Sequence, residues 1–368
     1  MLESLTLKPE MFGIDISDLS LKIVKLKKKG KYLSLSSFGE EKMPANIIKR
    51  GEIRDENTLA KVIKEALARV KGRKIKTKYV IASLPEEKAF LQVIQLPKMP
   101  KEDLKSAVIY EAENYIPLSI EEVYLDSQVV QPMVDHLDHF DVLIAALPKK
   151  TIDPYVSVLK SAGLKPVALE IESLSIARAL VKNEISPSPV FLVDFGATRT
   201  SFIIFSGYSL RFTSSIPVSS CNLTEAMAKA LQLTFAKAEE LKIKYGVKRD
   251  GKDEQSQKIF EILKSYLAEL VAQIKKCLDY YQAHSGHEHL PPNGKIVGKI
   301  LLSGGGANLK GLPEFLSSEL KIPVALANPW VNILPSPLKE VPQLPFEESL
   351  RYTTALGLAL RAQKETDD

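Results

Sequence analysis

The hydrophobic pattern at the start of the chain predicts a β-meander followed by a helix. Between residues 12 and 26 apolar residues alternate with polar ones on both sides of a short polar turn, which is typical of a β-hairpin. A third alternating run at residues 32–38 can extend the sheet. From Asp55 to Gly72 apolar residues recur instead at helical spacing, with a capping residue near the start and a glycine near the end.

The rest of the chain mixes strands and helices in the same manner. In the first half we expect strands at residues 79–84, 91–96, 123–130 and 140–147, and helices at 101–115 and 153–162. In the second half we expect strands at 190–195, 201–205, 209–213 and 300–303, and helices at 223–231, 236–245, 257–282 and 349–362. Residues 183–189 contain two prolines and are the best candidate for a linker, and the Pro-rich stretch 329–345 predicts an irregular connection.

Length and composition add limits to this pattern. The 368 residues, 45% of them hydrophobic, indicate two or three packed globular units. The 50 basic residues face 45 acidic ones and form no arginine-rich tract with interleaved aromatics, so nucleic acid is not an expected partner. The densest positive run, residues 22–31, predicts a solvated hairpin tip, with a phosphate or phospholipid patch as the alternative. No apolar window reaches the length of a membrane span, and two cysteines without CxxC spacing suit a reducing compartment. We therefore expect a cytoplasmic protein.

The most informative feature is an internal repeat. Residues 13–24 and 193–204 share the order strand, aspartate, short Gly/Ser/Thr turn, strand, and their aspartates Asp15 and Asp194 are separated by about half the chain. A carboxylate at the end of a buried strand can hold Mg²⁺ through its water shell, and the small turn residues let backbone N–H groups approach phosphate oxygens. Two such hairpins facing each other would clamp a triphosphate from both sides.

A third element follows the second repeat. Residues 302–307 are the end of a strand that continues into three glycines before a helical segment, a backbone able to pass close to a base or sugar. Each of the three elements is common when taken alone. Their order and spacing are what indicate a nucleotide site.

These elements resemble the phosphate-1, phosphate-2 and adenosine motifs of the superfamily of actin, Hsp70 and the sugar kinases. Within that superfamily the chain is similar to the FtsA-related PilM family of actin-like type IV pilus assembly proteins over nearly its whole length. The supporting segments are residues 111–118, 121–129, 162–173, 238–242 and 265–281.

The resemblance implies an α/β protein with a duplicated ribonuclease-H-like, actin-like, two-lobed fold and an inserted small α+β subdomain. The first lobe would comprise residues 1–78 and 166–186, and the inserted subdomain of FtsA/PilM type residues 79–165. The second lobe would comprise residues 187–348, and a C-terminal helix at 349–368 would return to the first lobe.

The resemblance also implies a function. The chain would be a cytoplasmic, nucleotide-binding scaffold of a type IV pilus, or related type II secretion, inner-membrane assembly platform, and at most a slow ATPase. It would bind ATP or ADP with Mg²⁺, and the N-terminal cytoplasmic peptide of a PilN-like membrane protein. Other platform proteins and an assembly ATPase are further candidate partners, and contact with the membrane would be only through the partner.

Carried onto this sequence, the family pattern assigns roles to individual residues. Asp15 and Asp194 would organise Mg²⁺, and Asp194, Glu170 and Glu172 are the catalytic candidates. The nucleotide-binding candidates are Asp15, Ser17, Ser20, Lys22, Gly196, Ala197, Thr198, Thr200, Glu239, Lys242, Gly304, Gly305, Gly306 and Asn308. Ser17 stands where relatives usually have glycine, and the charge of Asp18 would oppose phosphate binding unless it points away or meets a cation. We therefore expect weak binding or no hydrolysis.

Two other functions use the same superfamily fold. A small-molecule, sugar-type kinase would need an acceptor pocket and a carboxylate base near the γ-phosphate, and no sugar-binding constellation stands out. An FtsA-like cell-division protein would need an amphipathic anchor, whereas the tail after Arg361 is polar.

Two histidine clusters invite a metal hypothesis. His284, His287 and His289 lie beside glycine and a Pro-Pro pair, which indicates a solvated loop more than a zinc site with four firmly held ligands. His136 and His139, among aspartates, similarly predict a hairpin tip.

Overall fold

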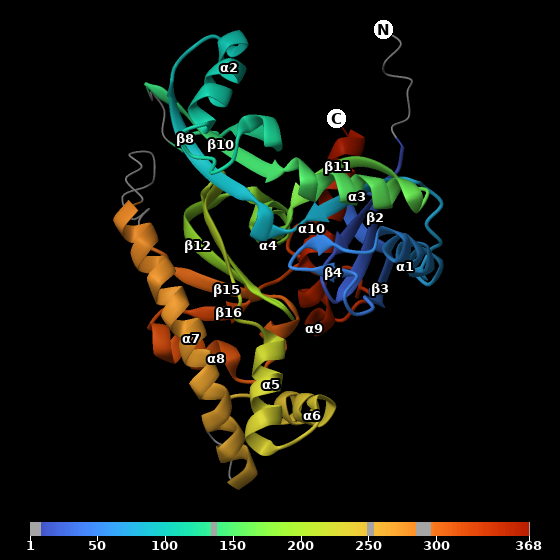
Figure 1. The fold of residues 1–368 in the computed structure, drawn as a ribbon, viewed down its shortest axis with the longest axis vertical. Coiled ribbons are helices and arrows are strands. Elements are labelled where there is room, and N and C mark those ends of the chain that lie inside the picture. The colour runs from blue at the N-terminus through green and yellow to red at the C-terminus, as the bar shows by residue number, and fades with distance from the viewer. Residues whose placement is uncertain (1–8, 134–137, 249–253, 285–295, 368) are drawn as a thin grey trace. The chain divides into compact units, whose positions relative to one another are not determined.

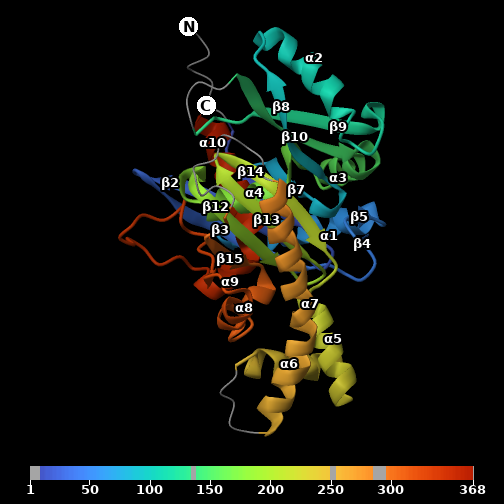
Figure 2. The ribbon, with the colours of Figure 1, turned by 90° about the vertical axis from the view of Figure 1, so that its left-hand side faces the viewer.

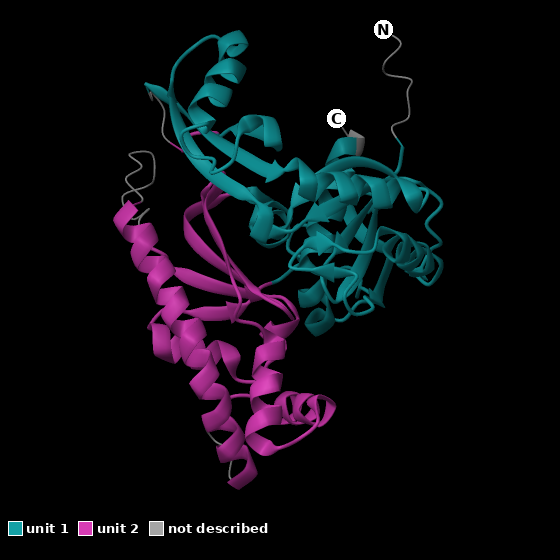
Figure 3. Ribbon diagram, in the orientation of Figure 1, with its two compact units in different colours: residues 1–130, 136–184, 328–368 teal, residues 131–135, 185–327 magenta. Residues whose placement is uncertain are grey.

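The computed structural model describes residues 9–133, 138–248, 254–284 and 296–367. The chain divides into two compact units, which are described separately (Figure 3). Unit 1 comprises residues 1–130, 136–184 and 328–368, and unit 2 comprises residues 131–135 and 185–327.

Unit 1 is built on a six-stranded sheet with the order β11-β7-β1-β2-β3-β6. Strands β1, β2 and β3 form the predicted antiparallel meander, and β7 and β11 join it parallel to β1. Strands β2, β3 and β11 of this sheet are labelled in Figure 1. The strand bounds are β1 Phe12–Ile16, β2 Ser20–Lys29, β3 Tyr32–Lys42, β6 Lys71–Gly72, β7 Tyr79–Leu84 and β11 Lys165–Ile171.

Helices cover both faces of this sheet. Helix α1 (Glu56–Ala68) begins after Asp55, whose carboxylate accepts the N–H of Thr58 at 2.9 Å, and it packs with α3 (Lys149–Ser161) against one face. Helices α4 (Glu172–Leu180) and α10 (Thr353–Asp367) pack together, and α10 lies on the other face. Strand β1 is covered on both faces. Phe12, Ile14 and Ile16 enter the core on the side of α1, and Gly13 faces α10.

A separate three-stranded antiparallel sheet, ordered β8-β10-β9, is inserted between β7 and β11. Helix α2 covers it and shares a small apolar core with it (Figure 2). The bounds are β8 Phe90–Pro97, α2 Lys101–Ala112, β9 Val123–Val129 and β10 His139–Pro148. Short elements complete unit 1: β4 Ile48–Lys49, β5 Glu52–Ile53, η2 Glu86–Lys88, η3 Ile120–Glu122, η4 Lys182–Glu184, α9 Phe346–Ser349 and η6 Leu350–Tyr352.

Unit 2 repeats the topology of the first sheet. Its five strands have the order β14-β13-β12-β15-β16, so an antiparallel meander is again extended by two strands parallel to its first member. The 31-residue helix α7 runs along unit 2 with a stripe of buried apolar residues at helical spacing (Figure 2). The bounds are β12 Ser186–Phe195, β13 Thr200–Gly207, β14 Ser209–Ile216, α5 Ser220–Leu231, α6 Phe235–Tyr245, α7 Glu254–His284, β15 Lys299–Ser303, η5 Gly305–Asn308, α8 Leu312–Leu320 and β16 Val324–Leu326.

The structure differs from the expected boundaries at two places. Strand β7, expected in the inserted subdomain, pairs with β1 in the main sheet of unit 1. Residues 328–348, expected in the second lobe, belong to unit 1 because Trp330, Ile333 and Leu344 are buried with Val24 and Phe38 of its sheet. Strands β11 and β16 and helix α4 were not predicted, and α3 begins four residues earlier than expected.

The histidine clusters are only partly described. His136, His287 and His289 lie outside the described residues. His139 Nδ1 contacts the carboxylate of Asp138 at 2.6 Å, and the ring of His284 stacks on that of Tyr280. In the described part of the chain, no three His, Cys, Asp or Glu side chains form a group that could hold a metal ion.

Candidate functional site

The first repeat ends in a buried aspartate held by a serine of the neighbouring strand. Asp15 is 5% exposed near the carboxyl end of β1, and its Oδ1 accepts a hydrogen bond from Ser83 Oγ of β7 at 3.0 Å. The same Ser83 Oγ accepts the N–H of Ile16 at 2.9 Å. Because β1 and β7 are parallel, their carboxyl ends meet at one edge of the sheet, the edge where ligands bind in open α/β sheets.

A lysine connects this aspartate to the following turn. Lys22 Nζ lies 3.8 Å from Asp15 Oδ2 and donates a hydrogen bond to Ser20 Oγ at 2.7 Å. Burial raises the pKa of Asp15, while the charge of Lys22 and the Ser83 hydrogen bond act to lower it. We call Asp15, Ser20, Lys22 and Ser83 the Asp15 cluster.

The turn of the first repeat is closed by its own polar groups. Ser17 donates both its N–H, at 3.0 Å, and its hydroxyl, at 2.9 Å, to the carbonyl of Ser20. The carboxylate of Asp18 accepts the N–H groups of Arg50 and Gly51, each at 3.0 Å. The charge of Asp18 is thus directed to the backbone N–H groups of residues 50–51. The carboxylate therefore has partners of its own, as phosphate binding beside it would require.

The second repeat ends in the same arrangement. Asp194, at the end of β12, is paired in register with Ser303 of the parallel strand β15, and Ser303 Oγ donates to its Oδ1 at 2.9 Å. Each sheet therefore carries an aspartate from its first strand and a serine from the adjacent parallel strand. Ser83 was not identified from the sequence, although it is the residue before the last of the buried strand β7, and Ser303 is the last residue of β15. We call Asp194 and Ser303 the Asp194 pair.

The loop after Asp194 is packed against the start of α5. The N–H of Gly196 donates to the carbonyl of Arg199 at 2.9 Å, and the carbonyls of Gly196 and Ala197 accept the N–H groups of Ser220 and Cys221. Thr200 is buried, and its hydroxyl donates to the carbonyl of Val218 at 2.6 Å. Ala197 and Thr198 are exposed at the tip of the loop. Among the nucleotide-binding candidates in this loop, Thr200 therefore uses its hydroxyl proton in a hydrogen bond to the backbone.

The glycines after β15 are required by packing. Gly304 has a φ of +82°, and a Cβ there would lie 2.5 Å from the carbonyl oxygen of Phe195. A Cβ at Gly306 would lie 2.6 Å from the Phe195 ring. Gly305 and Asn308 are exposed. These glycines allow η5 to pass the loop that follows Asp194.

The nucleotide-binding candidates Glu239 and Lys242 brace two helices. Lys242 of α6 is buried, and its Nζ donates to Ser220 Oγ and Thr224 Oγ1 of α5, both at 2.8 Å. It also lies 2.8 Å from Glu239 Oε2, which accepts a hydrogen bond from the Thr224 hydroxyl. The pair therefore fixes α6 on the first turns of α5.

The two glutamate candidates have different surroundings. Glu170 is buried and binds the Arg178 guanidinium through both oxygens at 2.6 Å, and its Oε1 lies 3.2 Å from Nη1 of Arg361. Glu172 begins α4, where its Oε2 accepts the N–H of Glu86 at 3.3 Å. The structure therefore brings Asp15, Ser20 and Lys22 together and places Glu170 in an arginine cluster.

Comparison with known proteins identifies the family. The family model described as type IV pilus assembly protein PilM matches residues 13–363. The chain belongs to the PilM family. A solved structure described as a PilM–PilN type IV pilus biogenesis complex is similar to this PilM-family chain, with a TM-score of 0.77 and 26% identity, over 96% of this chain and 98% of that one.

More distant relatives agree with this assignment. The cell division protein FtsA of Pseudomonas aeruginosa is 28% identical over 224 residues, covering 57% of this chain and 51% of FtsA. The chain spans about half the length of the curated relatives that it matches. ADP-bound MreB5 of Spiroplasma citri has the same fold, with a TM-score of 0.57, 13% identity and 98% coverage of both chains. The predicted actin-like α/β fold is therefore confirmed. In the described residues, no helix of this PilM-family chain has the length and apolar character needed to cross a bilayer.

Proposed function

We propose that the chain is a nucleotide-binding scaffold of the inner-membrane assembly platform of a type IV pilus or related type II secretion system. One observation supports nucleotide binding above all: the same Asp–Ser pair occurs at the same position of two sheets with the same strand order. The pairs are Asp15 with Ser83 and Asp194 with Ser303. The similarity to a fold that is known with bound ADP supports the same inference.

The expected ligand is ATP or ADP with Mg²⁺, and the chemistry of the two aspartates fits the metal. Carboxylate oxygens are preferred Mg²⁺ ligands, and the serine of each pair orients its aspartate at the carboxyl end of a buried strand. We propose that Asp15 and Asp194 hold Mg²⁺ through its water shell, where the metal would neutralise phosphate charge. Ser20 and Lys22 would position the phosphates beside Asp15.

This proposal predicts the effect of removing either aspartate charge. Asp15→Asn and Asp194→Asn should each weaken binding of a fluorescent ATP analogue with Mg²⁺ about tenfold or more, because a charge-assisted interaction is lost while the side-chain shape is kept. The measurement is a fluorescence titration with and without EDTA. The exposed Asp279→Asn, in α7, is the matched control and should bind like the unmodified chain. Equal affinities for all four proteins would remove the nucleotide proposal.

We further propose that the partner is the N-terminal cytoplasmic peptide of a PilN-like inner-membrane protein, through which the chain is held at the membrane. The similarity to the solved PilM–PilN complex over nearly the whole chain supports this. A pull-down with the N-terminal peptide of a PilN-like protein from the same organism should retain the chain, and a scrambled peptide should not. Equal retention by both peptides would contradict the proposal while leaving the nucleotide result unaffected.

We propose that ATP hydrolysis is slow or absent, and that the binding energy of the nucleotide is used to select a conformation of the chain. The two ion pairs of Glu170 support a structural role for this residue rather than activation of a water molecule. Other platform proteins and an assembly ATPase remain candidate partners.

A further inference from the structure

One end of the unit 1 sheet concentrates positive charge. At this end β1 and β7 begin, while Asp15 and Ser83 lie at their opposite ends. The connection between β6 and β7 crosses here, and five of the eight residues 71–78 are lysine or arginine. The positive run predicted from the sequence, residues 22–31, does not include this segment.

The backbone of the basic segment is anchored to the sheet. Strand β6 pairs with Ser37 and Phe38 of β3, and the next residue, Arg73, donates its N–H to the carbonyl of Ser36 at 3.0 Å. Farther along, Thr77 Oγ1 donates to the carbonyl of Glu10 at 2.6 Å. The backbone that carries these basic side chains is therefore held in place by hydrogen bonds.

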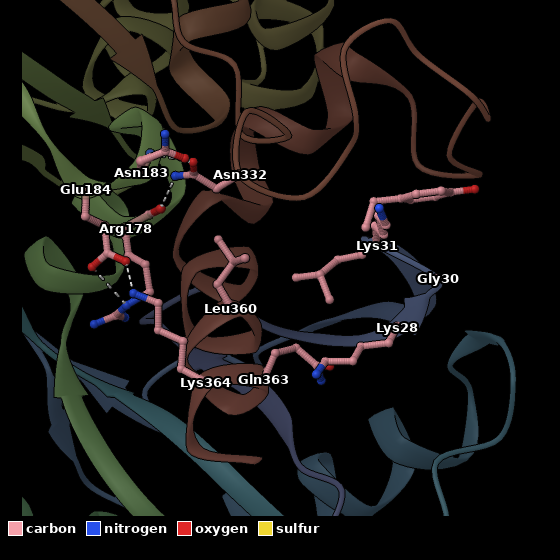
Figure 4. A pocket seen from close by; sticks show the side chains of 12 residues that line it. Lys28, Gly30, Lys31, Arg178, Asn183, Glu184, Asn332, Leu360, Gln363 and Lys364 are labelled. Carbon is pink, nitrogen blue, oxygen red and sulfur yellow. Dashed lines mark hydrogen bonds and ion pairs between the residues drawn. The ribbon is translucent and has the colours of Figure 1, made fainter. Parts of the chain in front are cut away.

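Three hollows surround the β2–β3 hairpin at this end. One of ≈ 370 Å³ is lined by Lys25, Lys27, Arg73, Lys74 and Lys76, together with Glu10 and Ser36. A second of ≈ 440 Å³ adjoins it and shares Lys27 and Arg73. A third of ≈ 580 Å³ lies between the hairpin turn and α10, where Lys28 and Lys31 come from the hairpin and Lys364 from α10 (Figure 4). Among the described residues, the three hollows are lined by nine cationic and three anionic side chains, and one of the cations, Arg178, is the partner of Glu170. We call this region the basic end of unit 1.

The anionic side chains in the basic end are already paired. Glu10 lies 2.5 Å from Lys25, which lowers the pKa of its carboxyl group. Glu340 pairs with Lys29, and Glu184 pairs with Lys364. Within the described residues, no carboxylate lies within 4.0 Å of the charged groups of Lys27, Arg73, Lys74 or Lys76. Among the described residues, Lys27, Arg73, Lys74 and Lys76 therefore give the basic end a positive charge that no neighbouring carboxylate balances.

The side chains around this charge indicate the kind of partner. Among the described residues, the ≈ 370 Å³ hollow is lined only by charged and polar side chains, whereas protein interfaces have an apolar core that is depleted in lysine. Proteins that bind single-stranded nucleic acid add aromatic stacking platforms to their basic grooves. Tyr32 and several apolar residues line the other two hollows, but the lysines clustered in the ≈ 370 Å³ hollow have no such groups beside them among the described residues. Such a cluster suits the diffuse charge of an anionic bilayer, where each basic residue near the surface strengthens binding about fivefold.

We propose that the basic end of unit 1 binds anionic phospholipid headgroups directly. This contact goes beyond the proposed attachment through a membrane-protein partner and requires neither that partner nor a nucleotide. It would orient the chain with the basic end of its first sheet toward the membrane and the Asp15 cluster at the opposite end of the same sheet.

The test is cosedimentation of the full chain with vesicles of phosphatidylcholine alone or mixed with phosphatidylglycerol. The chain should sediment only with the mixed vesicles, and binding should fall steeply as ionic strength rises. The triple variant Lys27→Gln, Lys74→Gln, Lys76→Gln should bind them at least about tenfold more weakly. A thermal melt of each variant verifies that it is folded.

A matched control distinguishes the effect of the basic end on vesicle binding from the effect of the chain's net charge. The variant Lys229→Gln, Lys275→Gln, Lys276→Gln removes the same charge from exposed positions of unit 2 and should bind mixed vesicles like the unmodified chain. The proposal is overturned if the unmodified chain ignores mixed vesicles or if both triple variants lose binding equally. It is also overturned if an acidic peptide, duplex DNA or inorganic phosphate competes the chain off the vesicles at constant ionic strength.

Discussion

Replacing Gly357 with alanine should lower the free energy of unfolding by about 3 kcal/mol or more. Gly357 lies in α10 where this helix crosses α4, and a Cβ there would lie 1.8 Å from the carbonyl oxygen of Ser175. Alanine is favoured over glycine inside a helix by about 1 kcal/mol, which is too little to offset such a clash with backbone atoms. The helices would have to separate, and the apolar contacts of α10 with the sheet would loosen. Chemical denaturation followed by circular dichroism measures the change.

A second glycine provides the control for this prediction. A Cβ at Gly298 would meet no atom within 4 Å, and the backbone there is not left-handed, so Gly298→Ala should leave stability nearly unchanged. A Gly357→Ala protein as stable as the Gly298→Ala protein would contradict the close approach of α10 and α4.

Replacing Glu170 with glutamine should cost about 3 kcal/mol of stability, because it removes the bidentate charged partner of a largely buried arginine and leaves it only the longer contact with Glu184 at 3.7 Å. The Glu170 side chain is 2% exposed and that of Arg178 is 14% exposed, and both oxygens of Glu170 bind this guanidinium at 2.6 Å. Burial acts against the charged form of Arg178, but the hydrogen bonds and charge of Glu170 outweigh it and raise the pKa of Arg178. The free energy of unfolding from urea titrations at low and high salt checks this prediction.

The same ion cluster contains its own control. Glu365 contacts Arg361 at 3.4 Å along α10, but its side chain is 42% exposed, so Glu365→Gln should cost less than about 0.5 kcal/mol. The Glu170→Gln effect should persist at high salt because the pair is shielded from solvent. If both variants were equally mild, Glu170 would not be the structural centre of the cluster, and its candidacy as a catalytic residue would be strengthened.

Local sequence patterns were sufficient to predict the two hairpins that contain Asp15 and Asp194. Period-two alternation and turn residues act over a few neighbouring positions, so the meanders and the long helix α7 are visible in the sequence. Strand β16 was missed because three residues are too few for a periodic signal, and β11 was missed because it begins with Lys165 and Pro166, so that its alternation is limited to Val167, Leu169 and Ile171. The place of residues 328–348 was also missed, since a Pro-rich stretch gives no periodic signal for the burial of Trp330.

The sequence by itself determined the duplicated aspartate hairpins through local alternation, and the resemblance of its motifs, taken in their order, indicated the fold class and the family. Only the tertiary structure decided which partner each polar group takes. Asp15 meets Ser83, 68 residues away, and Glu170 meets Arg361, 191 residues away. A buried polar group must find a hydrogen-bonding partner wherever the fold supplies one, and that choice depends on strand pairing and helix packing between distant segments.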